Sequence, residues 1–489
     1  MPSGQEIDLS VLAPELALTV TAVLSLLVGS WLPRRRQWVV RILALAGILT
    51  ALVATVVAMT GPSEITAAGS YTVDIGLNAV RLAVLVGTAI VIGLASDSIA
   101  GAKRESEFYV LLLLGALGII VIAGASDLLV LATGYLLASI PLYALVGFAK
   151  DRLGTEAMLK YYLLGALFGV LLLVGVVLLL ATGGSTVYAE LSRTLPRGPM
   201  GATAVGILAL VAGLLFKAGA VPAHFWVPDA IEGATPAVAA FVATVPKIGA
   251  LVALFRISTE VLGNLPLNWP LILALLAAVT MTLGNLAAFF QDSVRRLLAY
   301  STISQVGYLL MIVAAFGHST LALPSLLYYL LGYTITNLGA FAVVSAFTEY
   351  RTLADYTGLF RRHRWVALSL IVCLLGLVGT PPTAVFVGKL TAFTAAFDAN
   401  LGWLVVLAAA NSVASVFYYL RWIFPLFQRS PSGENNPHAD RPDTHTPSTA
   451  TTVGVWSVRI TIALAVISLA VGLAANPVLQ LLQSGAVSR

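Results

Sequence analysis

The feature that most limits how this chain can fold is an almost unbroken succession of apolar runs, each long enough to cross a bilayer. A transmembrane helix needs roughly 20 consecutive apolar residues. Only 10% of the 489 residues are charged, whereas soluble domains carry roughly 25%. The sequence therefore predicts an all-α integral membrane protein whose solvent is lipid.

The apolar runs predict about fourteen spanning helices. Their approximate bounds are 9–31, 38–60, 73–98, 107–124, 127–149, 157–182, 202–221, 234–256, 269–291, 296–317, 321–347, 365–397, 402–427 and 454–480. The only long polar segment lies at about 428–453 and is rich in Pro, Ser, Thr and Asn. That composition is typical of a flexible loop.

The Lys and Arg residues between the spans predict the orientation of the chain. The even-numbered loops, counted from the first span, hold only Arg193 and Arg197. The odd-numbered loops hold Arg34, Arg35, Arg36, Lys103, Arg104, Lys150, Arg152, Arg295, Arg296, Arg351, Arg361, Arg362, Arg364, Arg429 and Arg441. Because cytoplasmic loops carry an excess of Lys and Arg, the odd loops are predicted to be cytoplasmic and both termini to face outward. This distribution explains the net charge of +5 better than nucleic-acid binding does.

Two of the predicted spans contain helix-breaking residues. At the end of the seventh span Pro222 follows shortly after Lys217, and the twelfth span contains the segment 379–382, Gly-Thr-Pro-Pro. Proline cannot donate a backbone hydrogen bond, so it interrupts the helix. Prolines often kink membrane helices without a functional role. Broken helices five spans apart, each with a lysine nearby, instead favour a transport site in two inverted repeats.

The repeats divide the chain into five predicted parts. Residues 1–106 form accessory helices one to three, and 428–453 form the polar loop. The first inverted repeat covers 107–256 and contains helices four to eight. The second covers 269–427 and contains helices nine to thirteen, and 454–489 form the C-terminal helix.

Four lysines fall inside predicted spans: Lys160, Lys217, Lys247 and Lys389. A charged side chain inside a bilayer is costly, so such residues usually have a function. Burial favours the neutral amine, which allows proton exchange near neutral pH. Snorkelling to the interface is the alternative and partly fits Lys160, near the start of its helix. His224, after the first break, can also exchange protons, although a lone histidine is more often structural.

Other polar side chains in the spans can line a water chain or simply join helices by hydrogen bonds. They are Tyr300, Ser301, Thr302, Ser304, Gln305, Tyr308, Tyr333, Asn337, Asn411, Ser412, Ser415, Tyr418 and Tyr419. Asp127, Asp229 and Glu232 lie at span ends, where capping or exposure to water is the expectation.

The sequence offers few ways to hold a cofactor. Cys373 is the single cysteine, which excludes an internal disulfide and a cysteine-ligated cluster. A glycine-rich loop with a phosphate-binding lysine is missing from the sequence. We therefore expect no metal and no bound cofactor in this chain, and an ion gradient or a partner as the source of energy.

Five segments resemble the antiporter-like membrane subunits of respiratory complex I. They are residues 125–148, 156–169, 212–250, 295–310 and 375–389, and the similarity extends over nearly the whole chain. The sequence FVATVPK, at 241–247, places a lysine in the eighth helix and is most similar to N-type subunits of NADH–quinone oxidoreductase. L-type, M-type and Mrp antiporter subunits tend to have histidine there.

The resemblance implies proton translocation coupled to NADH oxidation and quinone reduction in partner subunits. NADH, FMN, iron–sulfur clusters and quinone would belong to those partners. By the same resemblance Lys217 is the central lysine, Lys247 the connecting lysine and Lys389 the terminal lysine, and Lys160 matches the sixth-helix lysine of the family. Adjacent antiporter-like and small membrane subunits would be the partners, in a bacterial inner membrane.

The chain departs from the family at one position. The family usually has a glutamate on the fifth helix, five residues before a proline, and here that position is Leu136 before Pro141. Another acid can replace it, Lys217 can be neutral at rest, or this copy can pump poorly. Three functions therefore stay open: a proton-pumping subunit, a subunit of an Mrp-type cation/proton antiporter, and a diverged copy with impaired pumping.

Overall fold

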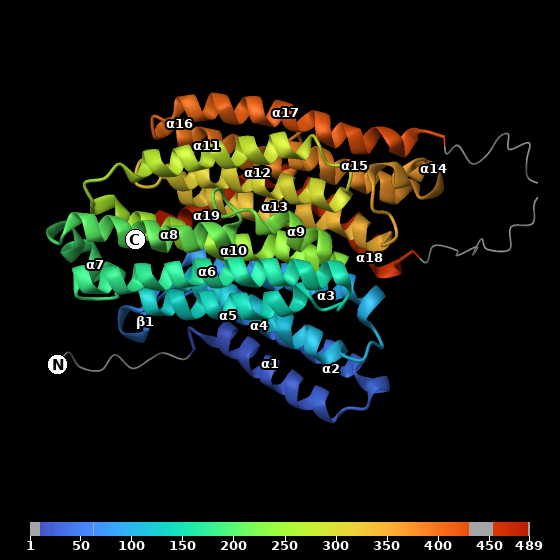
Figure 1. Cartoon of the computed structure of the whole chain (residues 1–489), viewed down its shortest axis with the longest axis horizontal. Helices are drawn as coiled ribbons and strands as arrows, with labels where there is room; N and C mark the ends of the chain where they lie inside the picture. Colours follow the sequence, from blue (N-terminus) through green and yellow to red (C-terminus); the bar gives the residue numbers. More distant parts are fainter. Residues whose placement is uncertain (1–9, 62, 430–452, 488–489) are drawn as a thin grey trace, which may run out of the picture.

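The computed structural model describes residues 10–61, 63–429 and 453–487. Within them the chain is almost entirely α-helical, and the long helices run roughly parallel to one another (Figure 1). The predicted loop at 428–453 falls largely outside the described residues. The two strands of the described residues, β1 (Glu64–Thr66) and β2 (Tyr71–Val73), form one antiparallel hairpin.

The helices follow the order of the predicted spans. The first three long helices are α1 (Ala13–Trp31), α2 (Trp38–Ala58) and α3 (Ile75–Ile99). The next group is α4 (Glu105–Gly124), α5 (Leu128–Val146), α6 (Arg152–Gly183), α7 (Tyr188–Thr194), α8 (Met200–Ala218), α9 (Trp226–Gly233) and α10 (Pro236–Glu260). The third group is α11 (Trp269–Ala288), α12 (Val294–Ala314), α13 (Ala322–Ala346), α14 (Leu359–Arg362), α15 (Arg364–Val378), α16 (Ala384–Asp398) and α17 (Gly402–Phe427). The last two are α18 (Val455–Leu473) and α19 (Ala475–Val487).

Thirteen helices in the described residues are long and apolar enough to cross a membrane. The predicted twelfth span is the exception, because it is divided into α15 and α16. Counting that pair as one crossing recovers the predicted fourteen. The last predicted span, 454–480, is also shorter than expected, since α18 ends at Leu473 and α19 begins at Ala475.

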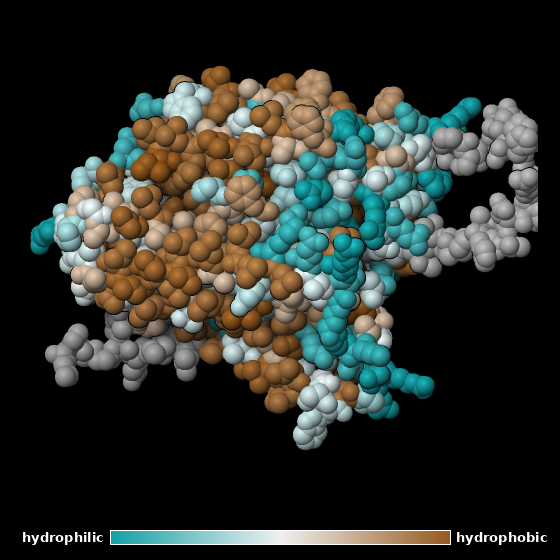
Figure 2. Space-filling model, in the orientation of Figure 1, coloured by the Kyte–Doolittle hydropathy of each residue, from teal (hydrophilic) through white to brown (hydrophobic). Residues whose placement is uncertain are grey.

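Three helices form the centre of the molecule. In the most apolar 18-residue stretch of α10 every residue is buried, and in those of α12 and α13 the buried share is 94%. These helices therefore contact protein on nearly all sides. Helices α1 and α2 lie at one edge and α17 at the opposite edge (Figure 1). Apolar side chains cover most of the visible face, and hydrophilic ones gather at the end where α14 lies (Figure 2). This distribution is that of a protein surrounded by hydrocarbon.

Both predicted helix breaks are present. Helix α8 ends at Ala218, and Gly219 adopts the left-handed conformation with φ of 80°. Helix α15 ends at Val378, and Gly379 has φ of 91°. Glycine reaches this region without a steric cost, which explains its place at both helix ends. The Val221–Pro222 and Pro381–Pro382 peptide bonds, one in each break, are cis.

Glycines allow neighbouring helix backbones to touch. A Cβ atom on Gly118 of α4 would lie 2.3 Å from the Ala138 backbone nitrogen of α5. Helices α11 and α12 pack in the same way, because a Cβ on Gly307 would lie 2.4 Å from the Met281 nitrogen. Close approach through small residues is the usual way in which membrane helices associate. The assignment of these helix pairs to two inverted repeats stays a prediction.

We predict that Gly307→Ala destabilises the protein by about 1–3 kcal/mol, because the added methyl group meets backbone atoms that cannot move aside. Denaturant unfolding of the purified full chain in mild detergent measures the change. Gly201→Ala is the matched control, since nothing lies within 4 Å of the added atom. Equal stability of the two variants would contradict the packing described here.

Candidate functional site

Three of the four predicted lysines are buried in the centre of the protein. Lys217, Lys247 and Lys389 are 1%, 0% and 4% exposed. Lys160 is different, because 48% of its side chain is exposed and it lies in the first turns of α6. The structure therefore separates one exposed lysine from three that have lost contact with bulk solvent.

Lys217 lies in the last turn of α8, directly before the first break. Its Nζ donates a hydrogen bond to Ser139 Oγ of α5 and lies 4.7 Å from the centre of the Tyr135 ring. The Ser139 hydroxyl in turn donates to the Tyr135 carbonyl at 2.6 Å, which leaves its lone pairs free to accept from the lysine. Leu136 is 44% exposed and points outward. The partners of Lys217 are thus a hydroxyl and an aromatic face.

Lys247 owes its acceptor to the proline before it in α10. Pro246 has no backbone N–H, so the Val242 carbonyl lacks its normal helical donor. Lys247 Nζ donates to this oxygen at 2.6 Å and lies 5.1 Å from the Trp226 ring centre. Its Cε is 3.9 Å from where a Cβ on Gly219 would lie. Lys217 and Lys247 therefore flank the same helix break.

Polar side chains of α12 and α13 surround the proline region of α10. The Tyr333 hydroxyl lies 2.9 Å from the Ala243 carbonyl and 3.1 Å from Thr302 Oγ1. Asn337 Nδ2 donates to Thr244 Oγ1 at 2.8 Å. Asn337 Oδ1 is buried and has no partner among the described residues. These contacts continue the polar region from Lys247 toward the second half of the chain.

Lys389 of α16 binds the open end of α15. Its Nζ donates to the Val378 carbonyl at 2.8 Å, and lies 3.4 Å from the Leu377 carbonyl and 3.3 Å from Ser412 Oγ. The last carbonyls of a helix have no donor within it and carry partial negative charge, so a nearby ammonium group is favourable. The ring of Tyr308 also lies under Nζ, at 4.3 Å.

Gln305 connects this lysine to the central helices. Its Nε2 donates to the Leu377 carbonyl at 2.8 Å, and its Oε1 accepts from the Tyr329 hydroxyl at 2.6 Å. Ser412 Oγ lies 3.1 Å from the Tyr308 hydroxyl. The polar residues predicted on the tenth span thus fall into two groups. Thr302, Gln305 and Tyr308 belong to the hydrogen-bond network around the lysines. Ser301 and Ser304 instead connect helices, through hydrogen bonds to Tyr419 and Asn285.

Among the described residues, neither His224 nor Lys160 is hydrogen-bonded to the three buried lysines. His224 is 5% exposed, in the segment between α8 and α9, and its Nδ1 has no partner among the described residues. Lys160 pairs with Glu156 at 2.8 Å and with Asp229 of α9 at 3.0 Å. Asp229 also pairs with Arg296 at 3.2 Å. Lys160 therefore belongs to a solvated group of charges that holds α9.

Several residues of the network could not be singled out from the sequence. They are Tyr135, Ser139, Trp226, Thr244 and Tyr329. Serine, threonine and aromatic residues are common in membrane helices, so only their distance from a lysine distinguishes them. Four of them, Tyr135, Ser139, Trp226 and Thr244, lie in segments that resemble the family, which is the signal that could have found them.

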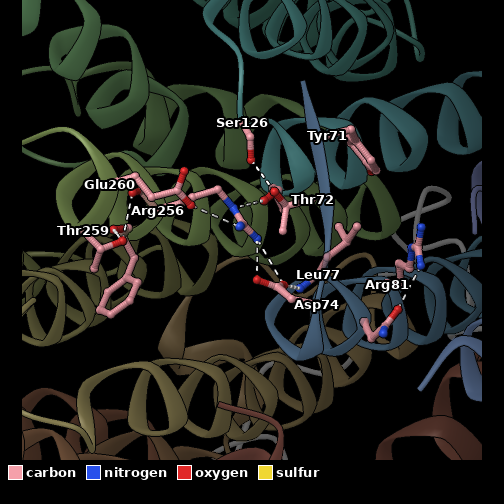
Figure 3. Close-up of polar contacts among 12 residues, drawn as sticks. Tyr71, Thr72, Asp74, Leu77, Arg81, Ser126, Arg256, Thr259 and Glu260 are labelled. Atoms are coloured by element: carbon pink, nitrogen blue, oxygen red, sulfur yellow. Dashed lines mark hydrogen bonds and ion pairs between the residues drawn. The ribbon is translucent and has the colours of Figure 1, made fainter. Parts of the chain in front are cut away.

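A second polar cluster consists of paired charges (Figure 3). The Arg256 guanidinium lies 3.1 Å from both carboxylate oxygens of Asp74, 3.5 Å from Glu260 and 3.2 Å from the Ala123 carbonyl. The neighbouring Arg81 pairs with Glu15 at 2.7 Å. No motif or spacing in the sequence distinguishes these residues. Because each cation has a carboxylate partner, we interpret the cluster as a structural tie between α1, α3 and α10.

The part of the chain that the structure describes contains no group of three or more His, Cys, Asp or Glu side chains arranged to hold a metal ion. Cys373 is buried, without a disulfide partner.

Comparison with known proteins gives consistent results. Residues 125–416 match the family described as NADH:quinone oxidoreductase/Mrp antiporter, TM. The chain is 54% identical to NADH-quinone oxidoreductase subunit N 1 of Streptomyces griseus over 421 residues, which cover 86% of this chain and 89% of that protein. It is 46% identical to subunit N of a Mycobacterium species over 474 residues, 96% of this chain and 97% of that protein.

Solved structures show the same fold. A chain of respiratory complex I from Thermus thermophilus is similar with a TM-score of 0.81 and 32% identity, covering 96% of this chain and all of that one. A chain of the Mrp complex from Dietzia gives a TM-score of 0.84 at 23% identity, covering 98% and 97%. The second likeness concerns the fold alone.

We predict that Asp74→Asn destabilises the protein by about 3–5 kcal/mol, because it leaves the buried Arg256 without its closest carboxylate. Asparagine keeps the shape and an oxygen that can cap α3 at Leu77. Asp292→Asn is the control, since Asp292 pairs with Arg421 in an exposed position where a loss below about 1 kcal/mol is expected. Denaturant unfolding in detergent measures both. Similar losses would show that the Asp74 pair is not a structural tie.

Proposed function

Because the chain belongs to the NADH:quinone oxidoreductase/Mrp antiporter family of membrane subunits, we propose that it is a proton-translocating membrane subunit of an NADH–quinone oxidoreductase. The observation that carries the proposal is the set of three buried lysines. Their hydrogen-bond acceptors are hydroxyl and carbonyl oxygens at two helix breaks and a proline. A lysine held by neutral groups can release its proton without leaving a carboxylate unpaired.

Protons move among Lys217, Lys247 and Lys389 in this proposal. Lys217 and Lys247 lie on either side of the break at Gly219. Polar groups lie between Lys247 and Lys389. They are the side chains of Tyr333, Thr302 and Gln305, and Gln305 donates to the Leu377 carbonyl beside Lys389. Water completes such a path, since the hydroxyl groups themselves are already hydrogen-bonded. A charge or shape change in a partner subunit favours the neutral or the charged form of each lysine in turn.

His224 and Lys160 are assigned to proton uptake. Lys160 lies in a solvated charge group with Asp229, at the end of the bundle that the loop charges place in the cytoplasm. His224 lies just before α9 and is buried, and its Nδ1, which has no hydrogen-bond partner among the described residues, is the atom that takes up the proton. Lys389 then delivers protons to the outer side. Both chain termini face outward, and the membrane is the inner membrane of a bacterium.

The source of energy lies in other subunits. NADH, FMN, iron–sulfur clusters and quinone bind to partner subunits, and adjacent antiporter-like and small membrane subunits contact this chain within the lipid bilayer. The relatives named as subunit N of NADH-quinone oxidoreductase support this assembly. The inverted repeats of 107–256 and 269–427 each contribute one broken helix to the path.

One alternative has a specific observation behind it. Leu136 replaces the family's glutamate and faces outward, so a diverged copy with impaired pumping remains a second candidate. A cation/proton antiporter of Mrp type fits less well, because the eighth-helix residue is Lys247 and the likeness to the Mrp chain extends to the fold alone.

We predict that Lys217→Ala, Lys247→Ala and Lys389→Ala each lower the number of protons pumped per NADH oxidised. Each variant removes a proton-holding group from the buried path. Vesicles containing the purified complex, with a pH-sensitive dye, measure pumping beside NADH oxidation. Lys103→Ala, in an exposed loop, is the control. Unchanged stoichiometry in all three variants would refute the relay.

We predict that Ser139→Ala slows pumping by an amount corresponding to roughly 1–3 kcal/mol, the cost of leaving a buried donor without an acceptor. Thr133→Ala is the matched control, because Thr133 lies on the same helix and makes the same bond to a preceding carbonyl, but is exposed.

Leu136→Glu separates the two candidate functions, a proton-pumping subunit and a diverged copy with impaired pumping. Higher pumping in Leu136→Glu than in the unchanged protein would favour the diverged copy, and no gain would favour Ser139 as a sufficient partner.

A further inference from the structure

The last membrane helix lies directly against the second helix break. A Cβ atom on Gly472 of α18 would lie 1.9 Å from the Pro382 carbonyl oxygen, 2.6 Å from the Thr383 carbonyl carbon and 2.8 Å from the Ala384 nitrogen. These are backbone atoms of the segment between α15 and α16 and of the first residue of α16. A side chain at residue 472 can therefore be accommodated only if the helix or the break moves.

Two hydrogen bonds fix α18 in this position along α13. Ser468 Oγ lies 2.8 Å from Thr336 Oγ1, and both side chains are fully buried. The Tyr328 hydroxyl donates to the Val471 carbonyl at 3.0 Å, one residue before Gly472. Sliding α18 to relieve a clash would break both bonds.

On the side away from α18, contacts with α13 prevent the break from moving. A Cβ on Gly388 of α16 would lie 3.0 Å from Tyr329 Cα, and a Cβ on Gly332 would lie 3.0 Å from Ala384 Cβ. Helix α16 is therefore in close contact with α13 while α18 presses on its first residues. The break is held between two helices, with a glycine at each contact.

The position of this segment sets the position of Lys389. Lys389 lies on α16, after the break, and its Nζ donates across the break to the Val378 carbonyl of α15. Its Cδ also lies 2.8 Å from where a Cβ on Gly379 would be. A shift of α16 relative to α15 therefore changes the distance between the ammonium group and the two carbonyls that accept from it.

We propose that Gly472 is a positioning residue for Lys389: the missing side chain lets α18 hold the second break at the separation where the lysine bridges α16 and α15. The role rests on the proposed function of Lys389 as a proton carrier. It extends the relay to a helix outside both predicted repeats.

The test compares Gly472→Ala, Lys389→Ala and the double variant in the complete complex, reconstituted into vesicles. Protons pumped per NADH oxidised are measured at equal amounts of assembled complex. We expect Gly472→Ala to lower this ratio, and the double variant to pump no worse than Lys389→Ala, because residues acting through one another are not additive. Additive losses would overturn the proposal. Ala470→Val is the control, because it adds volume on the exposed face of the same helix.

The design separates this inference from the function on which it rests. If Lys389→Ala leaves pumping unchanged, the proposed function fails. If Lys389→Ala lowers pumping and Gly472→Ala does not, the positioning role alone fails. If Gly472→Ala prevents assembly, Tyr328→Phe replaces it, since this variant removes the bond to Val471 and adds no atoms. A lower ratio in Tyr328→Phe that disappears in the Lys389→Ala background supports the role, and an unchanged ratio refutes it.

Discussion

Backbone carbonyls without a donor are costly inside a membrane, and much of this structure follows from where they occur. Each helix break and each internal proline frees such groups. At the end of α15 the Leu377 and Val378 carbonyls accept from Gln305 and Lys389, and in α10 the Val242 carbonyl accepts from Lys247. The same groups that stabilise the irregular backbone thus provide the neutral surroundings in which a lysine can exchange a proton.

Close packing keeps these irregular segments in place. Helices α10, α12 and α13 are nearly surrounded by protein, and glycines bring α11 to α12 and α18 to the second break within backbone contact. Because a packed interior does not deform continuously, a small shift of one helix is transmitted to its neighbours. A path that depends on hydrogen bonds across helices requires such stiffness, and it also becomes sensitive to distant residues.

The protein separates two kinds of buried charge. Arg256 and Arg81 have carboxylate partners and hold α1, α3 and α10 together. Lys217, Lys247 and Lys389 instead have hydroxyl, carbonyl and aromatic partners. A paired buried charge is expensive to disrupt and suits a structural role, whereas a lysine among neutral dipoles changes its protonation at a lower cost.

The sequence by itself determined the membrane helices, both breaks, the buried lysines and the family, because these depend on local composition and on short motifs. It did not determine the acceptors of the lysines or the arginine pairs. Ser139 lies 78 residues from Lys217, and Asp74 lies 182 residues from Arg256. Lys160, for which the sequence left both a buried role and snorkelling to the interface open, is exposed. Such contacts depend on which helix faces are packed together, and that is decided only when the whole bundle assembles, since polar residues of the same type occur on many faces.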